Sequence, residues 1–270
     1  MMITTVDIGA TKTLIGQFDS ASSLINESRF ATPAAFEAFL PILLEHLNSL
    51  DNITQLVVAV PGLISTDGTT VVRCGNLPWY DVPLKRILSD RYNCPVVIEN
   101  DAKLAALAEV KRLSPMPRLG LYLTISTGIG SGVVIDGKIP EPLTNSEAGH
   151  IAVYDGGKFV TWESIASGKA VVDHFKKLSN ELTDPADQRW IADRLCLGLY
   201  SIIPFLQPDV IIFGGGAGLS FDNYREYVTT NLNTNLPTDF IHLPELKVAH
   251  YGHQSVLYGC QYYARHSQTN

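Results

Sequence analysis

One short pattern occurs twice in the sequence, and this repeat restricts the fold more than any other feature. Residues 3–18 place a small polar turn between two apolar stretches, and residues 119–139 repeat that order with a glycine-rich turn at residues 126–132. The pattern predicts that each half of the chain begins with a β-hairpin. Two such turns facing one another would hold a polyphosphate, because glycine lets backbone N–H groups come close to phosphate oxygens.

Each turn also has a simpler interpretation. The first is not a Walker loop, since G-x-x-x-x-G-K-[ST] is absent, and a single D-x-G-x-T is also typical of an ordinary hairpin turn. The second does not fit a dinucleotide-binding fingerprint, which requires a helix to start inside the glycines, whereas a strand follows here. Asp7, at the end of the first strand, can hold a magnesium ion directly or through water.

Residues 96–102 predict a buried strand that ends in Glu99, Asn100 and Asp101 and continues into an alanine-rich helix. Two short polar side chains then lie at the carboxyl end of a strand, where open α/β folds bind ligands. This position makes Asp101 a candidate catalytic base. Asn and Asp are also favoured helix N-caps, and the stretch alone does not separate the two roles.

Several other stretches are candidates for ligand binding. Glu147 and His150 are three residues apart beside a glycine and can point at one small polar ligand. Glu163 opens a helix predicted at residues 162–178, where a carboxylate also suits the helix dipole. Residues 73–83 are predicted to form a loop whose polar and aromatic groups line a sugar site or cover an edge of the core.

A buried strand at residues 209–213 ends in three consecutive glycines. A surface without side chains can accept a flat purine and its ribose, and a tight turn is the alternative. Three glycines lose much backbone entropy on folding, which favours the close-approach role.

Composition excludes several classes of protein. A net charge of −7 in 270 residues argues against a nucleic-acid surface built on bulk positive charge. No run of about 18 apolar residues predicts a membrane span, and no signal peptide is evident, so a cytoplasmic protein is expected. The four cysteines form no C-x-x-C pair and are interpreted as reduced thiols.

Six blocks together resemble the ROK family of sugar kinases and repressors, in order and over nearly the whole chain. The blocks are D-I-G-A-T-K-T from Asp7, E-N-D-A from Glu99, S-T-G-I-G-S-G from Ser126, E-A-G-H from Glu147, E-S-I-A-S-G from Glu163 and F-G-G-G from Phe213. The resemblance implies an α/β, two-lobed actin-like ATPase (ribonuclease H-like) fold with an interlobe cleft. With the Pro115 and Pro117 boundary, we expect an N-terminal lobe at residues 1–116, a C-terminal lobe at residues 117–253, and a terminal helix at residues 254–266 on the first lobe.

The resemblance also implies a role for each matching residue. Asp101 corresponds to the general base that takes a proton from a sugar hydroxyl. The expected sugar-binding residues are Asn100, Glu147, His150, Glu163, Gly62, Gly75 and Asn76. The expected donor-binding residues are Asp7, Gly9, Thr11 and Lys12 in the first turn, Thr127, Gly128 and Gly130 in the second, and Gly215 and Gly216 beside adenosine, with magnesium at Asp7.

The expected function is a hexose kinase that transfers the terminal phosphate of ATP, with glucose and its 6-hydroxyl as the default substrate and a homodimer as the family tendency. A non-catalytic sugar-binding or regulatory ROK protein and a polyphosphate-dependent glucokinase are the alternatives. A repressor of this family carries a DNA-binding domain ahead of the first block, and that block begins here at Asp7.

Most of the family holds a structural zinc with one His and three Cys after the E-x-G-H block. Here His150 is present, but residues 151–162 contain no cysteine. We therefore predict no zinc site, so metal analysis of the purified protein should find no zinc. One zinc per chain would contradict this prediction.

Overall fold

The computed structural model describes residues 2–266 and divides them into two compact units. The first unit contains residues 2–108 and 254–266, and the second contains residues 109–253. The chain leaves the first unit within helix α3 (Asp101–Lys111), ahead of the expected boundary at the prolines. It returns just before helix α9 (Ser255–His266), which packs against strands β1 and β4 of the first unit.

A five-stranded sheet in the order β3-β2-β1-β4-β8 forms the centre of the first unit. Its strands are β1 (Ile3–Ile8), β2 (Lys12–Phe18), β3 (Leu24–Ala31), β4 (Gln55–Val60) and β8 (Val96–Asn100). The predicted first hairpin is β1 with β2, which pair antiparallel. Strands β4 and β8 run parallel to β1, so the carboxyl ends of these three strands share one edge of the sheet.

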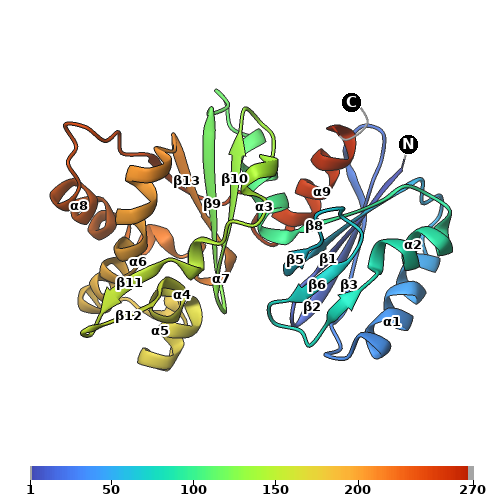
Figure 1. The fold of residues 1–270 in the computed structure, drawn as a ribbon, viewed down its shortest axis with the longest axis horizontal. Coiled ribbons are helices and arrows are strands. Elements are labelled where there is room, and N and C mark those ends of the chain that lie inside the picture. The colour runs from blue at the N-terminus through green and yellow to red at the C-terminus, as the bar shows by residue number, and fades with distance from the viewer. Residues whose placement is uncertain (1, 267–270) are drawn as a thin grey trace. The chain divides into compact units, whose positions relative to one another are not determined.

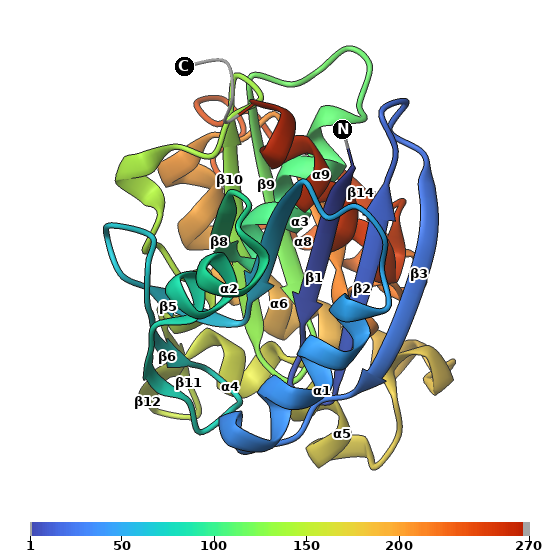
Figure 2. The ribbon, with the colours of Figure 1, turned by 90° about the vertical axis from the view of Figure 1, so that its right-hand side faces the viewer.

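The central strands are buried on both faces because alternate side chains point to opposite sides. Val6 and Val58 pack with helices α1 (Phe36–Asn48) and α2 (Leu84–Tyr92), whereas Val57 and Ala59 pack with α3 and α9. Figure 2 shows α1 and α2 in front of this sheet and α3 and α9 behind it. This two-sided burial explains why β4 reads as a continuous apolar run.

The stretch at residues 73–83 differs from the predicted loop. Its two ends belong to a three-stranded sheet of β5 (Gly62–Ile64), β6 (Val71–Cys74) and β7 (Tyr80–Val82), and only the middle of it is a loop. Trp79 is buried, and its indole N–H donates to the Ala34 carbonyl at 2.8 Å, so it belongs to the core.

The second unit repeats the strand order of the first. Its sheet runs β10-β9-β13-β14, with β9 (Leu119–Ile125), β10 (Ile129–Ile135), β13 (Val210–Gly214) and β14 (Glu245–Val248). Strands β9 and β10 form the second predicted hairpin, and β13 and β14 run parallel to β9. The order and directions match those of β2-β1-β4-β8, so the repeat in the sequence is a repeat of the fold.

Helices cover one face of the second sheet, as α6 and α8 do in Figure 1. They are α4 (Trp162–Ala166), α5 (Gly168–Phe175), α6 (Pro185–Leu206), α7 (Gly215–Gly218) and α8 (Arg225–Asn235). The single helix predicted at residues 162–178 is wrong. Ser167 is extended there and its side chain accepts the Ala170 N–H at 3.2 Å, so it ends α4 and caps α5.

Helix α6 begins with a side-chain cap and a proline. The Asp184 side chain accepts the Ala186 N–H at 2.8 Å, and Pro185 occupies the first turn. Further along, Gly198 lies against the buried ring of Trp162, where a Cβ atom would overlap the indole. Among residues 2–266, none of the helices combines the length and apolar character that a membrane span requires.

We predict that Gly198→Ala destabilises the protein by about 2 kcal/mol, because overpacking displaces the Trp162 ring. A glycine-to-alanine change inside an exposed helix normally stabilises the helix by about 1 kcal/mol. The sign of the change in unfolding free energy therefore tests the contact between Gly198 and Trp162. Urea unfolding would measure the change. Ser201→Ala, at an exposed position of the same helix, is the matched control and should unfold at the wild-type midpoint or above. Stabilisation by Gly198→Ala would contradict the tight packing.

Candidate active site

Polar side chains of the first unit gather at the carboxyl ends of its parallel strands. Asp7 of β1 is aligned with Ala59 of β4, which is aligned with Glu99 of β8, and Val60 is aligned with Asn100. The segment after β4 and the start of α3 therefore lie at the same sheet edge as Asp7. This edge is where open parallel sheets bind ligands.

The Asn100 side chain joins two of these segments. Its Oδ1 accepts the N–H of Lys103 at 3.2 Å and its Nδ2 donates to the Gly62 carbonyl at 3.2 Å. Nearby, the Gly75 N–H donates to the Pro61 carbonyl at 2.7 Å. These bonds bring Gly62, Gly75 and Asn100 together, three of the residues expected to bind sugar.

Asn100, and not Asp101, makes the side-chain cap to the third N–H of α3. Asp101 begins the helix, with its Oδ1 accepting the N–H of Ala102 at 2.8 Å, and it stays partly exposed. Asn100 therefore takes the capping role, and the role of Asp101 as a base stays a prediction. A carboxylate in the first turn of a helix is favoured in its ionised form.

Asp7 lies close enough to Asp101 for their charges to interact. Burial, and after it the charge of Asp101, raise the pKa of Asp7 from 3.8 to about 8, although Lys12 acts in the opposite direction. Asp7 keeps partial solvent contact, although protein forms most of its surroundings. Two neighbouring carboxylates in a poorly solvated place suit a divalent cation, which would stabilise the ionised form of both.

Cys74, at the end of β6, is another neighbour of Asp101. Burial, and then the charge of Asp101, raise the pKa of its thiol to about 12. Asn76 follows on the exposed surface. The sequence did not connect Cys74 with the site, since the pairing of β6 with β5 that brings it there is invisible in a local pattern.

The first turn presents backbone donors. The Gly9 N–H donates to the Lys12 carbonyl at 3.0 Å and closes the turn, and the Thr11 carbonyl accepts from Thr32 at 3.1 Å. Within residues 2–266, the N–H groups of Ala10 and Thr11 make no hydrogen bond. Two adjacent donors beside a threonine hydroxyl and the exposed Lys12 can bind phosphate oxygens.

The second turn has the same arrangement. The Ser126 N–H donates to the Gly128 carbonyl at 2.9 Å, and the N–H groups of Thr127 and Gly128 make no hydrogen bond to any described residue. Gly130 is placed differently from its expected neighbours in the turn. It lies within β10, aligned with Thr124 of β9.

The remaining glycines lie beside this turn. Gly214 ends β13 in register with Thr124, so the carboxyl ends of β9 and β13 are adjacent. Gly215 has a φ of +75°, and a Cβ there would lie 2.6 Å from the Thr124 Oγ1. A Cβ at Gly216 would meet no atom within 4 Å. Gly215 is therefore required by the backbone, whereas Gly216 leaves an open surface.

Three expected sugar-binding residues of the second unit lie near the same hairpin. Glu147 precedes a short 3-10 turn (Ala148–His150), and the Ala148 N–H donates to the Ser131 Oγ of β10 at 3.0 Å. The exposed His150 has its Nε2 3.7 Å from the Glu163 Oε1. Carboxylate and imidazole groups with partial exposure are suited to hydrogen bonding with sugar hydroxyls.

Residues 151–162 form a hairpin that the sequence did not predict. It consists of β11 (Ala152–Asp155) and β12 (Lys158–Thr161). No cluster of three or more His, Cys, Asp or Glu that could hold a metal ion occurs within residues 2–266. The absence of zinc stays a prediction.

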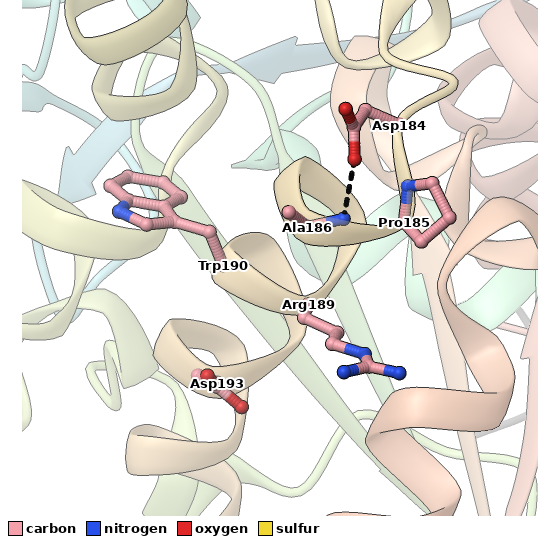
Figure 3. Close-up of a pocket in the computed structure, with 6 residues that line it drawn as sticks. All are labelled: Asp184, Pro185, Ala186, Arg189, Trp190 and Asp193. Atoms are coloured by element: carbon pink, nitrogen blue, oxygen red, sulfur yellow. Dashed lines mark hydrogen bonds between the residues drawn. The ribbon is translucent and has the colours of Figure 1, made fainter.

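A surface hollow of about 570 Å³ lies elsewhere in the second unit, at the start of α6. Figure 3 shows its lining, which consists of Asp184, Pro185, Ala186, Arg189, Trp190 and Asp193. It contains no residue of the candidate site. The close-up also shows Asp184 turned back onto the Ala186 N–H, a contact that caps the helix.

The sequence matches the ROK family over residues 3–267. A glucokinase of Streptomyces coelicolor is 30% identical over 194 residues, which span 67% of this chain and only 61% of that protein. An N-acetylmannosamine kinase of Vibrio cholerae is 28% identical over 288 residues, covering 95% of this chain and 97% of the relative.

The fold is also found in solved structures. A ROK family glucokinase from Streptomyces griseus, solved in complex with glucose and AMPPNP, has a TM-score of 0.84. The two chains are 24% identical, with 98% of this chain and 100% of that chain covered. The likeness shows that the chain has the actin-like ATPase fold of ROK sugar kinases.

We predict that Asp7→Asn stabilises the metal-free protein more at pH 8 than at pH 5. An Asp whose pKa is raised by folding costs stability as the pH rises from 3.8 towards 8, since the unfolded chain gives up the proton first. The variant removes this cost, so its Tm should exceed that of the wild type by about 5 °C or more at pH 8 in EDTA.

Calorimetry at both pH values would measure the difference. Asp90→Asn, at an exposed position of α2, is the control and should show no such pH dependence. A Tm difference for Asp7→Asn that is the same at pH 5 and pH 8 would contradict the raised pKa.

Proposed function

The chain belongs to the ROK family, and we propose that it is a cytoplasmic sugar kinase that transfers the terminal phosphate of ATP to a hydroxyl of a hexose. The repeated turn carries the proposal. Each unit ends its first strand in a turn with two adjacent N–H groups and a threonine, at residues 10–11 and residues 127–128. Backbone N–H groups arranged in this way bind anions, and a polyphosphate such as ATP is the class of ligand that suits them.

We propose that Thr11 and Lys12 in the first turn, and Thr127 and Gly128 in the second, bind the phosphates of the donor. Gly215 and Gly216 follow β13 beside the second turn, and their lack of side chains suits an adenosine group. Magnesium, when bound at Asp7 directly or through water, would neutralise charge on the transferred phosphate. The raised pKa of Asp7, caused by burial and by Asp101, supports a cation there.

Sugar recognition is assigned to polar groups of both units. The Glu147 and Glu163 carboxylates can accept hydrogen bonds from hydroxyls, and the His150 imidazole can donate or accept one. Asn100 has one amide N–H beyond its bond to Gly62. Gly75 and Asn76 lie beside that contact on the first unit. The relatives named above act on glucose and N-acetylmannosamine by name, which supports a hexose as the substrate class.

Asp101 acts as the general base in this proposal. Its carboxylate accepts the proton of the attacking sugar hydroxyl while the bond from that oxygen to the terminal phosphorus forms. The bond between this phosphorus and the bridging oxygen breaks, and ADP leaves with the electron pair. The Asn100 cap fixes the start of α3, so the carboxylate is held by a helix and not by a loop.

An ADP-release assay tests the function. Glucose is the first substrate to try, with its 6-hydroxyl as the acceptor, alongside mannose, fructose, allose, N-acetylmannosamine and N-acetylglucosamine. A parallel series with polyphosphate in place of ATP, read as sugar phosphate formed, identifies the donor. Sugar binding without product from either donor would support the non-catalytic alternative.

We predict that Asp101→Asn retains sugar binding but loses at least about 10²-fold in kcat, the lower end for general-base catalysis. The amide keeps the size and one acceptor oxygen of the carboxylate but cannot take the proton. Steady-state kinetics and calorimetric sugar binding would measure the two effects separately. Asp90→Asn serves as the control and should keep the wild-type kcat. A near-normal kcat for Asp101→Asn would contradict the assignment.

A further inference from the structure

Glu163 contacts the second turn as well as the residues assigned to sugar. Its Oε2 accepts the backbone N–H of Ile129, the first residue of β10, at 3.3 Å. The same segment contacts the other end of the turn, where the Lys169 N–H donates to the Ser126 carbonyl at 3.2 Å. Residues 163–169 therefore hold both ends of the turn that presents Thr127 and Gly128.

Three glycines make these contacts possible. A Cβ at Gly128 would lie 2.5 Å from the Glu163 Oε2, and a Cβ at Gly168 would lie 2.7 Å from the Ser126 carbonyl oxygen. A Cβ at Gly149, in the E-A-G-H block, would overlap the carbonyl of Ile129. The turn is thus enclosed by the two blocks, E-A-G-H and E-S-I-A-S-G, that the sequence connects with sugar.

The backbone that carries Glu163 is fixed on the core. Trp162 is fully buried, its N–H donates to the Ile151 carbonyl at 2.8 Å, and its indole N–H donates to the Arg194 carbonyl at 3.1 Å. Because the backbone of Glu163 is held firmly by these contacts, its carboxylate has little freedom to move and can restrain the turn.

We propose that Glu163 is a positioning residue for the phosphate donor: by holding the Ile129 N–H, it fixes the turn so that Thr127 and Gly128 present their N–H groups to phosphate. The inference rests on the proposed kinase function and assigns to Glu163 a second role beside sugar binding. The two carboxylate oxygens make different contacts. Oε2 accepts the Ile129 N–H, and Oε1 lies 3.7 Å from the His150 Nε2.

The arrangement has a thermodynamic consequence. A sugar that fixes the Glu163 carboxylate also restrains the turn, so sugar and donor should each bind more tightly when the other is present. Because linkage is reciprocal, both affinities change by the same factor. A Glu163 that served the sugar alone would not change donor affinity in the absence of sugar.

The test is donor binding without sugar. Calorimetric titration of the full-length chain with AMPPNP and MgCl₂ would compare the wild type with Glu163→Ala and Glu163→Gln. Glu163→Ala should weaken the donor at least about fivefold, the effect of losing one hydrogen bond. Glu163→Gln should stay within about twofold of the wild type, because its amide oxygen can still accept from Ile129.

His150→Ala is the matched control, since it removes the neighbour of the other Glu163 oxygen and leaves the contact to Ile129 in place. It should weaken glucose binding while leaving AMPPNP affinity within about twofold. Equal donor loss in His150→Ala and Glu163→Ala would overturn the inference. Melting curves of each variant would show that it remains folded.

The remaining outcomes separate the inference from the proposed function. Unchanged AMPPNP affinity in Glu163→Ala, with sugar binding lost, would overturn the positioning role and leave the kinase proposal standing. A wild-type protein that binds no donor and phosphorylates no sugar would overturn both.

A double-mutant cycle gives a second measurement. Gly128→Ala adds a methyl group at the contact with the Glu163 Oε2, and its φ is not in the left-handed region. Its effect on donor affinity should be clearly smaller in the Glu163→Ala background than in the wild type, because the clashing partner is gone. Additive effects would overturn the proposed contact.

Discussion

The parallel pairing of β1 with β4, and of β9 with β13, is the constraint on which the site depends. It aligns Asp7 with Ala59 and Thr124 with Gly214, and so brings chain segments far apart in sequence to one edge of each sheet. The antiparallel second strand then forces a tight turn at that same edge. Backbone donors, carboxylates and glycine surfaces follow from this geometry, and the side chains add selectivity to it.

Within each unit, hydrogen bonds to backbone groups organise several of the polar side chains. Asn100 bonds to Lys103 and to Gly62, and Glu163 accepts from Ile129. The carboxylates of Asp7 and Asp101 lie close enough for their charges to interact, and burial makes the ionised form of Asp7 unfavourable. A cation bound there would stabilise the ionised carboxylates.

Local sequence patterns predicted the two hairpins and the strand β8, because their signals lie within a few consecutive residues. Local patterns gave wrong predictions where contacts between distant residues determine the structure. The helix predicted at residues 162–178 is interrupted at Ser167, whose side chain accepts the Ala170 N–H. The burial of Trp79 depends on its hydrogen bond to the Ala34 carbonyl. The six-block resemblance named the candidate site residues, but the bond from Ile129 to Glu163 spans 34 positions and has no local signature.

The missing side chain at Gly128 has a consequence for how this sequence can change over generations. A Cβ at position 128 would force the Glu163 carboxylate to move from its present place, so the two positions are expected to vary together. A homologue that gains a larger residue at the first should carry a shorter one at the second, and its turn should be restrained by some other group. Joint substitution of such a pair would mark branches of the family in which donor and acceptor recognition have separated.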